Sequence, residues 1–99
     1  MRYYSVIRTR DVDTPEMFDW CDRVLGQGVV KDHTDRKHWS YSVYPVGKHY
    51  ASQFAFASIN KKMLFDIRWS DVTIYNSIGE YYQQNVLAPL SAEQRQWAL

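Results

Sequence analysis

The strongest guide to the fold of this chain is the segment Ser52–Trp69, SQFAFASINKKMLFDIRW. Phe54 and Phe56 alternate with small residues, which is the period-two pattern of a β-strand. A polar break at Asn60–Lys62 separates this strand from a second apolar run, Met63–Trp69. The second run fits a strand with alternate residues on one face, and it also fits a helix with apolar residues at spacings of four. We expect a helix, because the residues KKML at its start are strong helix formers.

A first helix is predicted near the N-terminus. Asp13 or Thr14 supplies an N-cap, and Pro15 suits the first helical position. Gly26 is expected to end the helix, because glycine readily adopts positive φ. The apolar residues between these signals recur at helical spacing and predict one buried stripe. They are Met17, Phe18, Cys21, Val24 and Leu25.

Four segments have the composition of strands, and with the two helices they predict an α+β fold. These segments are Tyr3–Thr9, Trp39–Val46, Tyr50–Ser58 and Asp71–Ser77. We expect residues 1–79 to form one domain with an antiparallel sheet of about four strands and two helices on one face. The element order resembles that of ferredoxin-like domains. Residues 80–99 are predicted to form a C-terminal arm, with an extended linker over Asn85–Leu90 and a short helix that begins at Ser91.

Charge and cysteine content limit the classes of partner and compartment. The formal net charge is +1, so no long-range field attracts nucleic acid or a membrane surface. The lone Cys21 excludes an internal disulfide framework and fits a reducing compartment. No run approaches the ~18 apolar residues of a membrane span, and no apolar signal-peptide region follows Met1–Tyr4. We therefore expect a soluble, cytoplasmic protein without a membrane partner.

The strand over Ser52–Ile59, SQFAFASI, suggests a function through its pattern FAF. It resembles the third strand of RNA-recognition-motif domains, which carries two aromatic residues that stack on bases. Ser52 stands where that motif has Lys or Arg, and Gln53 stands where it has Gly. The resemblance implies a base-stacking role for Phe54 and Phe56.

Single-stranded nucleic-acid binding is therefore the alternative function. Tyr4 on the first strand would add a third ring to Phe54 and Phe56. Phosphate contacts would come from cations in or near the polar loop between the first helix and the hairpin. They are Lys31, Arg36, Lys37 and Lys48. The opposing interpretation places both Phe rings in the core, where large apolar groups are most often found.

The aromatic content favours a different leading hypothesis. The chain has four Trp and eight Tyr, residue types that are enriched at protein interfaces. So many rings are hard to bury in 99 residues, so some are expected at the surface. Our interface candidates are Trp39, Tyr41, Tyr81, Tyr82 and Trp97. We expect a small protein-binding module that docks on another protein or on a second copy, as an accessory, inhibitor or virion-type protein of the kind phages encode.

Catalytic and metal chemistry find little support in the sequence. His33, His38 and His49 do not have the spacing of a zinc site. Cys21 lies within an apolar stripe, where a thiol behaves as a small hydrophobic group. The carboxylates around the first helix belong to its solvated side. We therefore expect no catalytic residue, no metal and no cofactor, and a protein that is not an enzyme.

Overall fold

The computed structural model describes residues 2–26 and 38–88, which form a small α+β domain on a three-stranded sheet. The strands are β1 (Tyr3–Arg8), β2 (Trp39–Val46) and β3 (His49–Phe56). Their order is β1-β3-β2, and both pairings are antiparallel. The predicted α+β class and antiparallel sheet are thus confirmed.

The register of the sheet sorts large and small side chains onto opposite faces. Phe54 lies opposite Tyr41, and Phe56 lies opposite Trp39, so β2 and β3 present these rings to one face. Because side chains alternate along a strand, Ala51 and Ala55 point to the other face. Helices cover the centre of the face that carries the phenylalanines, since Phe54 and Phe56 are both 0% exposed.

Helix α1 (Thr14–Leu25) begins and ends where the sequence predicts. The Asp13 carboxylate accepts a hydrogen bond at 3.3 Å from the backbone amide three residues later. The helix ends at Gly26, whose φ is +97°, and a Cβ there would lie 2.9 Å from the His38 ring. Only glycine fits this position without strain. The predicted stripe holds except for Val24, which is 49% exposed.

Helix α2 (Ile59–Arg68) settles the ambiguous segment in favour of a helix. The Ser58 hydroxyl caps it by accepting a hydrogen bond from the Lys61 amide at 3.3 Å. Phe65 points inward, and its ring centroid lies 4.7 Å from that of Phe54. The α1 and α2 helices therefore share one face of the sheet, as predicted. The core between them is mostly aromatic and sulfur-containing, and its buried members are Ile7, Met17, Cys21, Leu25, Trp39, Phe54, Phe56, Phe65 and Trp69.

The predicted fourth strand is not formed. In the described part of the chain, residues 71–77 contribute only an isolated bridge between Tyr75 and Val6 of β1. The two residues exchange backbone hydrogen bonds of 2.7 and 2.8 Å. Val72 instead bonds back to the carbonyl of Trp69 at 3.1 Å, which turns the chain as it leaves α2. Neither the four strands nor the ferredoxin-like order is confirmed.

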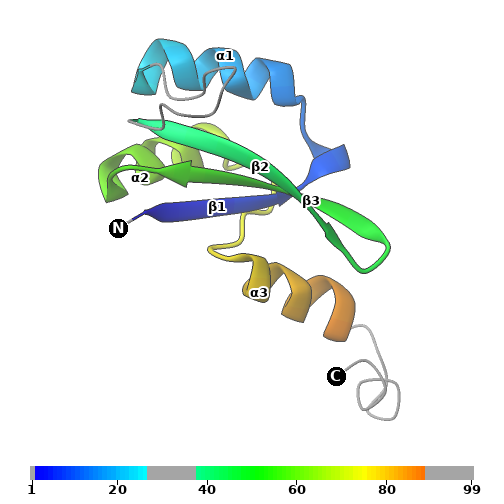
Figure 1. Ribbon diagram of the computed structural model, residues 1–99. Helices are drawn as coiled ribbons and strands as arrows, with labels where there is room; N and C mark the ends of the chain where they lie inside the picture. The colour runs from blue at the N-terminus through cyan, green and yellow to red at the C-terminus, as the bar shows by residue number, and fades with distance from the viewer. Residues whose placement is uncertain (1, 27–37, 89–99) are drawn as a thin grey trace.

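The chain then crosses to the other face of the sheet (Figure 1). Helix α3 (Ile78–Tyr82) continues into the π-helical turn η2 (Gln83–Leu87), so the extended linker predicted from Asn85 is wrong up to Leu87. Figure 1 shows α1 above the sheet and α3 below it. A second, smaller core joins α3 to the sheet, and its buried members are Val6, Val46, Ala51 and Tyr81. The helix predicted from Ser91 lies outside the described residues.

Candidate functional site

The rings predicted to form a protein interface are mostly internal. Trp39 is 1% exposed and Tyr81 is 0% exposed, so neither is available to a partner. Tyr41 and Tyr82 are partly buried and pack against the first and second core respectively. Trp97 lies outside the described residues. Burial removes Trp39 and Tyr81 from the surface, while the interface roles of Tyr41, Tyr82 and Trp97 stay predictions.

The rings predicted to stack on bases do not form a platform. Phe54 and Phe56 are covered by the helices, while Tyr4 is 37% exposed on the opposite face of the sheet. The register explains this separation, because Tyr4 lies opposite Ala55 rather than a phenylalanine. The mechanism predicted from the resemblance thus lacks accessible phenylalanine rings.

Of the four residues predicted to contact phosphate, only Lys48 lies within the described residues. Lys31, Arg36 and Lys37 lie outside the described residues. Lys48 is exposed in the turn between β2 and β3, where it lines a pocket together with Arg8 and Arg10. Sequence reasoning missed these two arginines, because they lie at the end of β1 and in the residues after it, distant from Lys48 in the chain.

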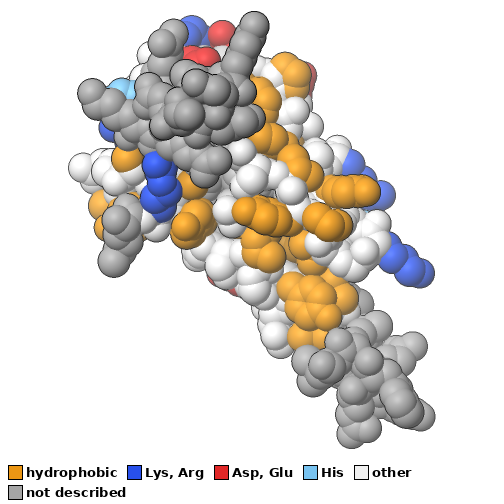
Figure 2. Space-filling model, viewed as in Figure 1, with side chains coloured by type: hydrophobic (Ala, Val, Ile, Leu, Met, Phe, Trp, Pro, Cys, Tyr) orange, Lys and Arg blue, Asp and Glu red, His pale blue; other side chains and the backbone are white. Residues whose placement is uncertain are grey.

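The exposed large apolar side chains gather on α2. Ile59, Met63 and Ile67 follow one another at spacings of four, which places them in a row along the helix. They are 45%, 53% and 68% exposed, and neighbouring Leu64 is 49% exposed. We call these four residues the apolar α2 face. Hydrophobic side chains also reach the surface over the sheet and α3 (Figure 2).

The inward side of α2 is anchored by charge as well as by Phe65. Lys62 is only 9% exposed, and its ammonium group pairs with the Asp66 carboxylate one turn later. The other oxygen of Asp66 accepts a hydrogen bond at 2.6 Å from the hydroxyl of Ser5 on β1. A buried charge needs such partners. This network fixes how far α2 is rotated, and so which residues it turns outward.

One edge of the apolar α2 face carries positive charge. Lys61 and Arg68 lie three residues before and four residues after Leu64, so they line up beside it. The Arg68 guanidinium lies 4.0 Å from the Trp69 ring centroid and 3.7 Å from a Glu16 carboxylate oxygen. The Arg68 side chain is 45% exposed, so its ion pair with Glu16 is weak in water. The edge therefore remains open to an acidic partner.

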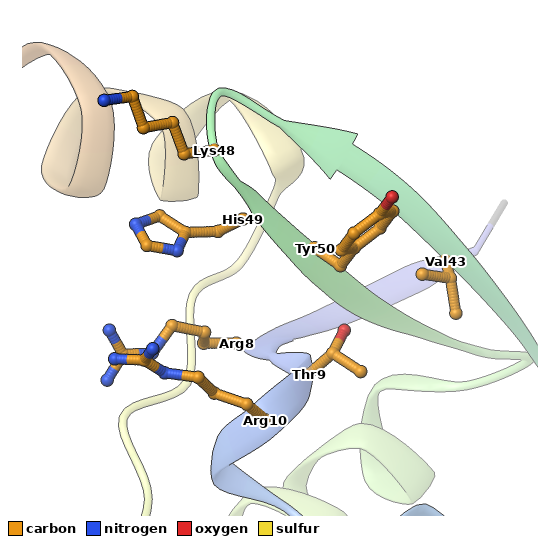
Figure 3. A pocket seen from close by; sticks show the side chains of 7 residues that line it. All are labelled: Arg8, Thr9, Arg10, Val43, Lys48, His49 and Tyr50. Carbon is orange, nitrogen blue, oxygen red and sulfur yellow. The ribbon is translucent and has the colours of Figure 1, made fainter.

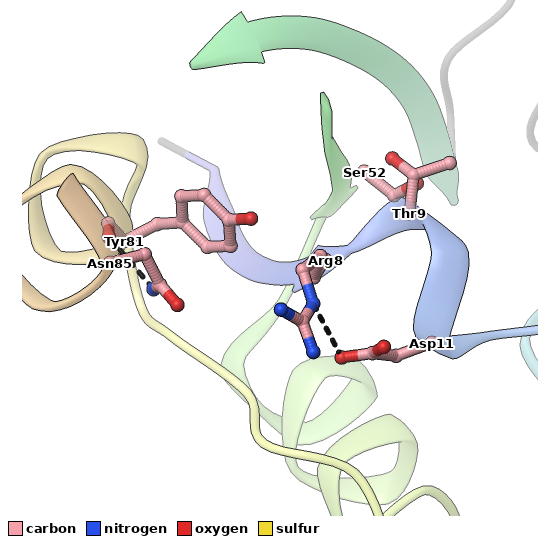
Figure 4. Close-up of polar contacts among 6 residues, drawn as sticks. All are labelled: Arg8, Thr9, Asp11, Ser52, Tyr81 and Asn85. Atoms are coloured by element: carbon pink, nitrogen blue, oxygen red, sulfur yellow. Dashed lines mark hydrogen bonds and ion pairs between the residues drawn. The ribbon is translucent and has the colours of Figure 1, made fainter. Parts of the chain in front are cut away.

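A polar cavity of about 240 Å³ lies between β1 and η2, with Arg8 and Asn85 in its wall. Arg8 donates a 2.9 Å hydrogen bond to Asp11 in η1 (Thr9–Asp11), which raises the pKa of Arg8 (Figure 4). The Tyr81 hydroxyl points toward this arginine, and it is buried without a hydrogen-bond partner in the structure. Burial raises the pKa of Tyr81.

Cys21 is the single thiol of the chain, and it faces the core. Desolvation raises its pKa from 9.0 to about 12, so the nucleophilic thiolate is disfavoured at neutral pH. Among residues 2–26 and 38–88, no cluster of three His, Cys, Asp or Glu side chains could hold a metal ion.

We expect Cys21 to react with iodoacetamide at pH 8 at least about a thousand-fold more slowly in the folded protein than in urea, because reaction requires opening of the core. The elevated pKa also predicts that Cys21 contributes stability below about pH 9, which is lost as the pH rises toward 12. Mass spectrometry of timed samples measures the labelling. Similar rates in buffer and in urea would show that the helix α1 does not bury this side chain.

Comparisons with known proteins add no relative. The chain matches no protein-family model, no curated protein and no solved structure at a significant level. Within the part of the chain that the structure describes, no helix is both long and apolar enough to cross a membrane.

The sequence contained a signal for the apolar α2 face. The segment Met63–Trp69 is apolar at both helical and strand spacing, which left its outward residues undefined. Once the segment is a helix, Phe65 and Trp69 occupy its inner side. The row Ile59, Met63 and Ile67 has the spacing that ordinarily marks a buried stripe, but in the structure it faces outward.

Proposed function

We propose that this protein is a small protein-binding module that docks through the apolar α2 face. The observation that carries the proposal is the row of Ile59, Met63 and Ile67, each about half exposed or more, with Leu64 beside it. Single exposed apolar residues are common on soluble proteins, but contiguous groups mark interaction sites. The module is proposed to act by binding, as an accessory or inhibitory protein, and not as an enzyme.

The partner is proposed to be a protein segment with apolar side chains bordered by acidic ones. Lys61 and Arg68 give the apolar α2 face a cationic edge, so a complementary surface carries Asp or Glu along one side. An antiparallel pair of α2 helices from two copies would bring the same cationic edges together. Charge complementarity therefore favours a different protein over self-association.

The binding surface is held in place before the partner arrives. Phe65 and the contacts among Lys62, Asp66 and Ser5 fix α2 on the sheet. A rigid helix loses little conformational entropy on binding, so more of the contact energy appears as affinity. Helix-in-groove or helix-on-helix docking suits a row of residues spaced by four.

A library of random 16-residue peptides displayed on phage provides a defined probe. Selection on the immobilised protein should enrich sequences that combine large apolar residues with Asp or Glu. In the variant Met63→Glu/Ile67→Glu, binding of a selected peptide should weaken at least about ten-fold, because central apolar contacts dominate interfaces. Fluorescence anisotropy of the labelled peptide measures the affinity.

The matched control is Gln83→Glu/Gln84→Glu, which adds the same two charges at exposed positions of η2. This control should bind the peptide as the parent protein does, and both variants should unfold at the parent temperature. Equal binding by all three proteins, or enrichment of basic peptides, would contradict the proposal. A dimer in light scattering that Met63→Glu/Ile67→Glu dissolves would instead identify a second copy as the occupant.

A further inference from the structure

A cationic notch lies at the end of the sheet where β1 stops and β3 continues. The last residue pair between the two strands is Arg8 with Ala51, and beyond it β1 turns away into η1. Tyr50 and His49 extend β3 past this point, paired only with β2. The space left beside them is a pocket of about 300 Å³, at the small end of ligand-binding pockets.

Three cationic side chains from two segments lie on one side of the notch, beside His49 (Figure 3). Arg8 ends β1 and Arg10 lies in η1, while Lys48 lies in the hairpin turn and His49 begins β3. The Arg8 bond to Asp11 uses Nε, which leaves its terminal amino groups available. Within residues 2–26 and 38–88, neither Arg10 nor Lys48 takes part in an ion pair.

The opposite side of the notch is apolar and aromatic (Figure 3). Tyr50 is 61% exposed, more than any other large aromatic side chain among the described residues, and Val43 beside it is 45% exposed. The Thr9 hydroxyl has its hydrogen-bond partner in Ser52, so it closes the pocket floor without needing a ligand. A ring this exposed buries little apolar surface on folding, and it is accessible for stacking on a flat ligand.

We propose that this notch binds a nucleotide unit, with its phosphate held by Arg8, Arg10 and Lys48 and its base stacked on Tyr50. Guanidinium groups match phosphate oxygens in geometry and charge, and a lysine adds a point charge. The whole chain has a net charge of only +1. The notch, with three cationic side chains and only the Asp11 carboxylate beside them, is therefore a local concentration of positive charge. This site is separate from the apolar α2 face, and it does not depend on the function proposed there.

Isothermal titration with AMP, adenosine and inorganic phosphate at low salt tests the proposal. AMP should bind at least about ten-fold more tightly than adenosine or phosphate alone, because it engages both sides of the notch. Added salt should weaken the binding. Arg10→Gln/Lys48→Gln should reduce the affinity for AMP at least about ten-fold, and Tyr50→Ala should bring it close to that of phosphate.

The control Arg23→Glu changes the net charge by the same two units at an exposed position of α1, and it should leave AMP binding unchanged. Equal losses in this control and in Arg10→Gln/Lys48→Gln, or AMP binding no tighter than inorganic phosphate, would overturn the proposal. So would the absence of AMP binding at millimolar concentration. A comparison of dTMP with 5′-phosphorylated oligo(dT) identifies the source, since tighter binding of the oligonucleotide indicates a strand and equal binding indicates a free nucleotide.

Discussion

Replacing Phe54 by alanine is expected to lower the free energy of unfolding by about 3–5 kcal/mol. The ring is 0% exposed at the centre of the first core, and its centroid lies 4.7 Å from Phe65 and 5.1 Å from Tyr41. Truncation removes the buried apolar surface and leaves a cavity that the surrounding rings cannot fill. Because small domains are stable by about 5–15 kcal/mol, this loss is a large share of the total stability.

Urea denaturation followed by tryptophan fluorescence measures this loss. The matched control is Tyr50→Ala on the same strand, where the ring is 61% exposed and the cost should be within about 0.5 kcal/mol. A Phe54→Ala variant as stable as the parent would place the ring at the surface. It would also restore the base-stacking role predicted from the FAF pattern.

The Asp66→Ala substitution has the second largest expected effect, a loss of about 2–4 kcal/mol in unfolding free energy. It leaves the 9% exposed Lys62 with an uncompensated charge and deprives the Ser5 hydroxyl of its acceptor. The side chain of Asp66 is itself 32% exposed, so water relieves part of the penalty.

A double-mutant cycle of Lys62→Met, Asp66→Asn and their combination separates the lost pair from simple truncation. In Lys62→Met/Asp66→Asn, the charge is gone and the amide oxygen can still accept the hydrogen bond from Ser5. Urea denaturation should show that this protein is within about 1 kcal/mol of the parent, since apolar replacement of a buried ion pair is often neutral. A loss in the combined variant equal to the sum of the two single losses would show that the charges do not interact.

Local signals predicted most of the helices and strands correctly. Asp13 and Ser58 cap the two helices through the hydrogen bonds expected of such residues, and Gly26 has the positive φ expected at a helix end. These features depend on a few neighbouring residues, so the sequence alone reveals them. The same holds for β2 and β3, whose alternation is visible in the chain.

The fourth strand could not be predicted correctly, because its composition does not reveal where the chain must turn. The residues DVTIYNS have strand composition, but the turn after α2 uses the backbone of Val72. Only Tyr75 reaches the edge of β1. Strand formation depends on a partner edge being available along the whole segment, which is a tertiary property.

The burial of Trp39 was not predicted for a related reason. Trp39 was expected at the surface because its ring has a polar group, yet its Nε1 donates to the Gly26 carbonyl at 2.9 Å within the fold. Tyr41 likewise meets the Ser52 hydroxyl at 3.0 Å. An internal partner removes the need to face water. Such partners come from residues distant in the chain, so composition does not predict them.

The measurement that tests the central claim is an NMR titration of the ¹⁵N-labelled protein with the phage-selected acidic peptide. Docking through the apolar α2 face predicts that the largest amide shift changes fall within Ile59–Arg68, with little change in α3 or η2. Shift changes centred on Tyr41 or on Tyr82, with α2 unaffected, would contradict it.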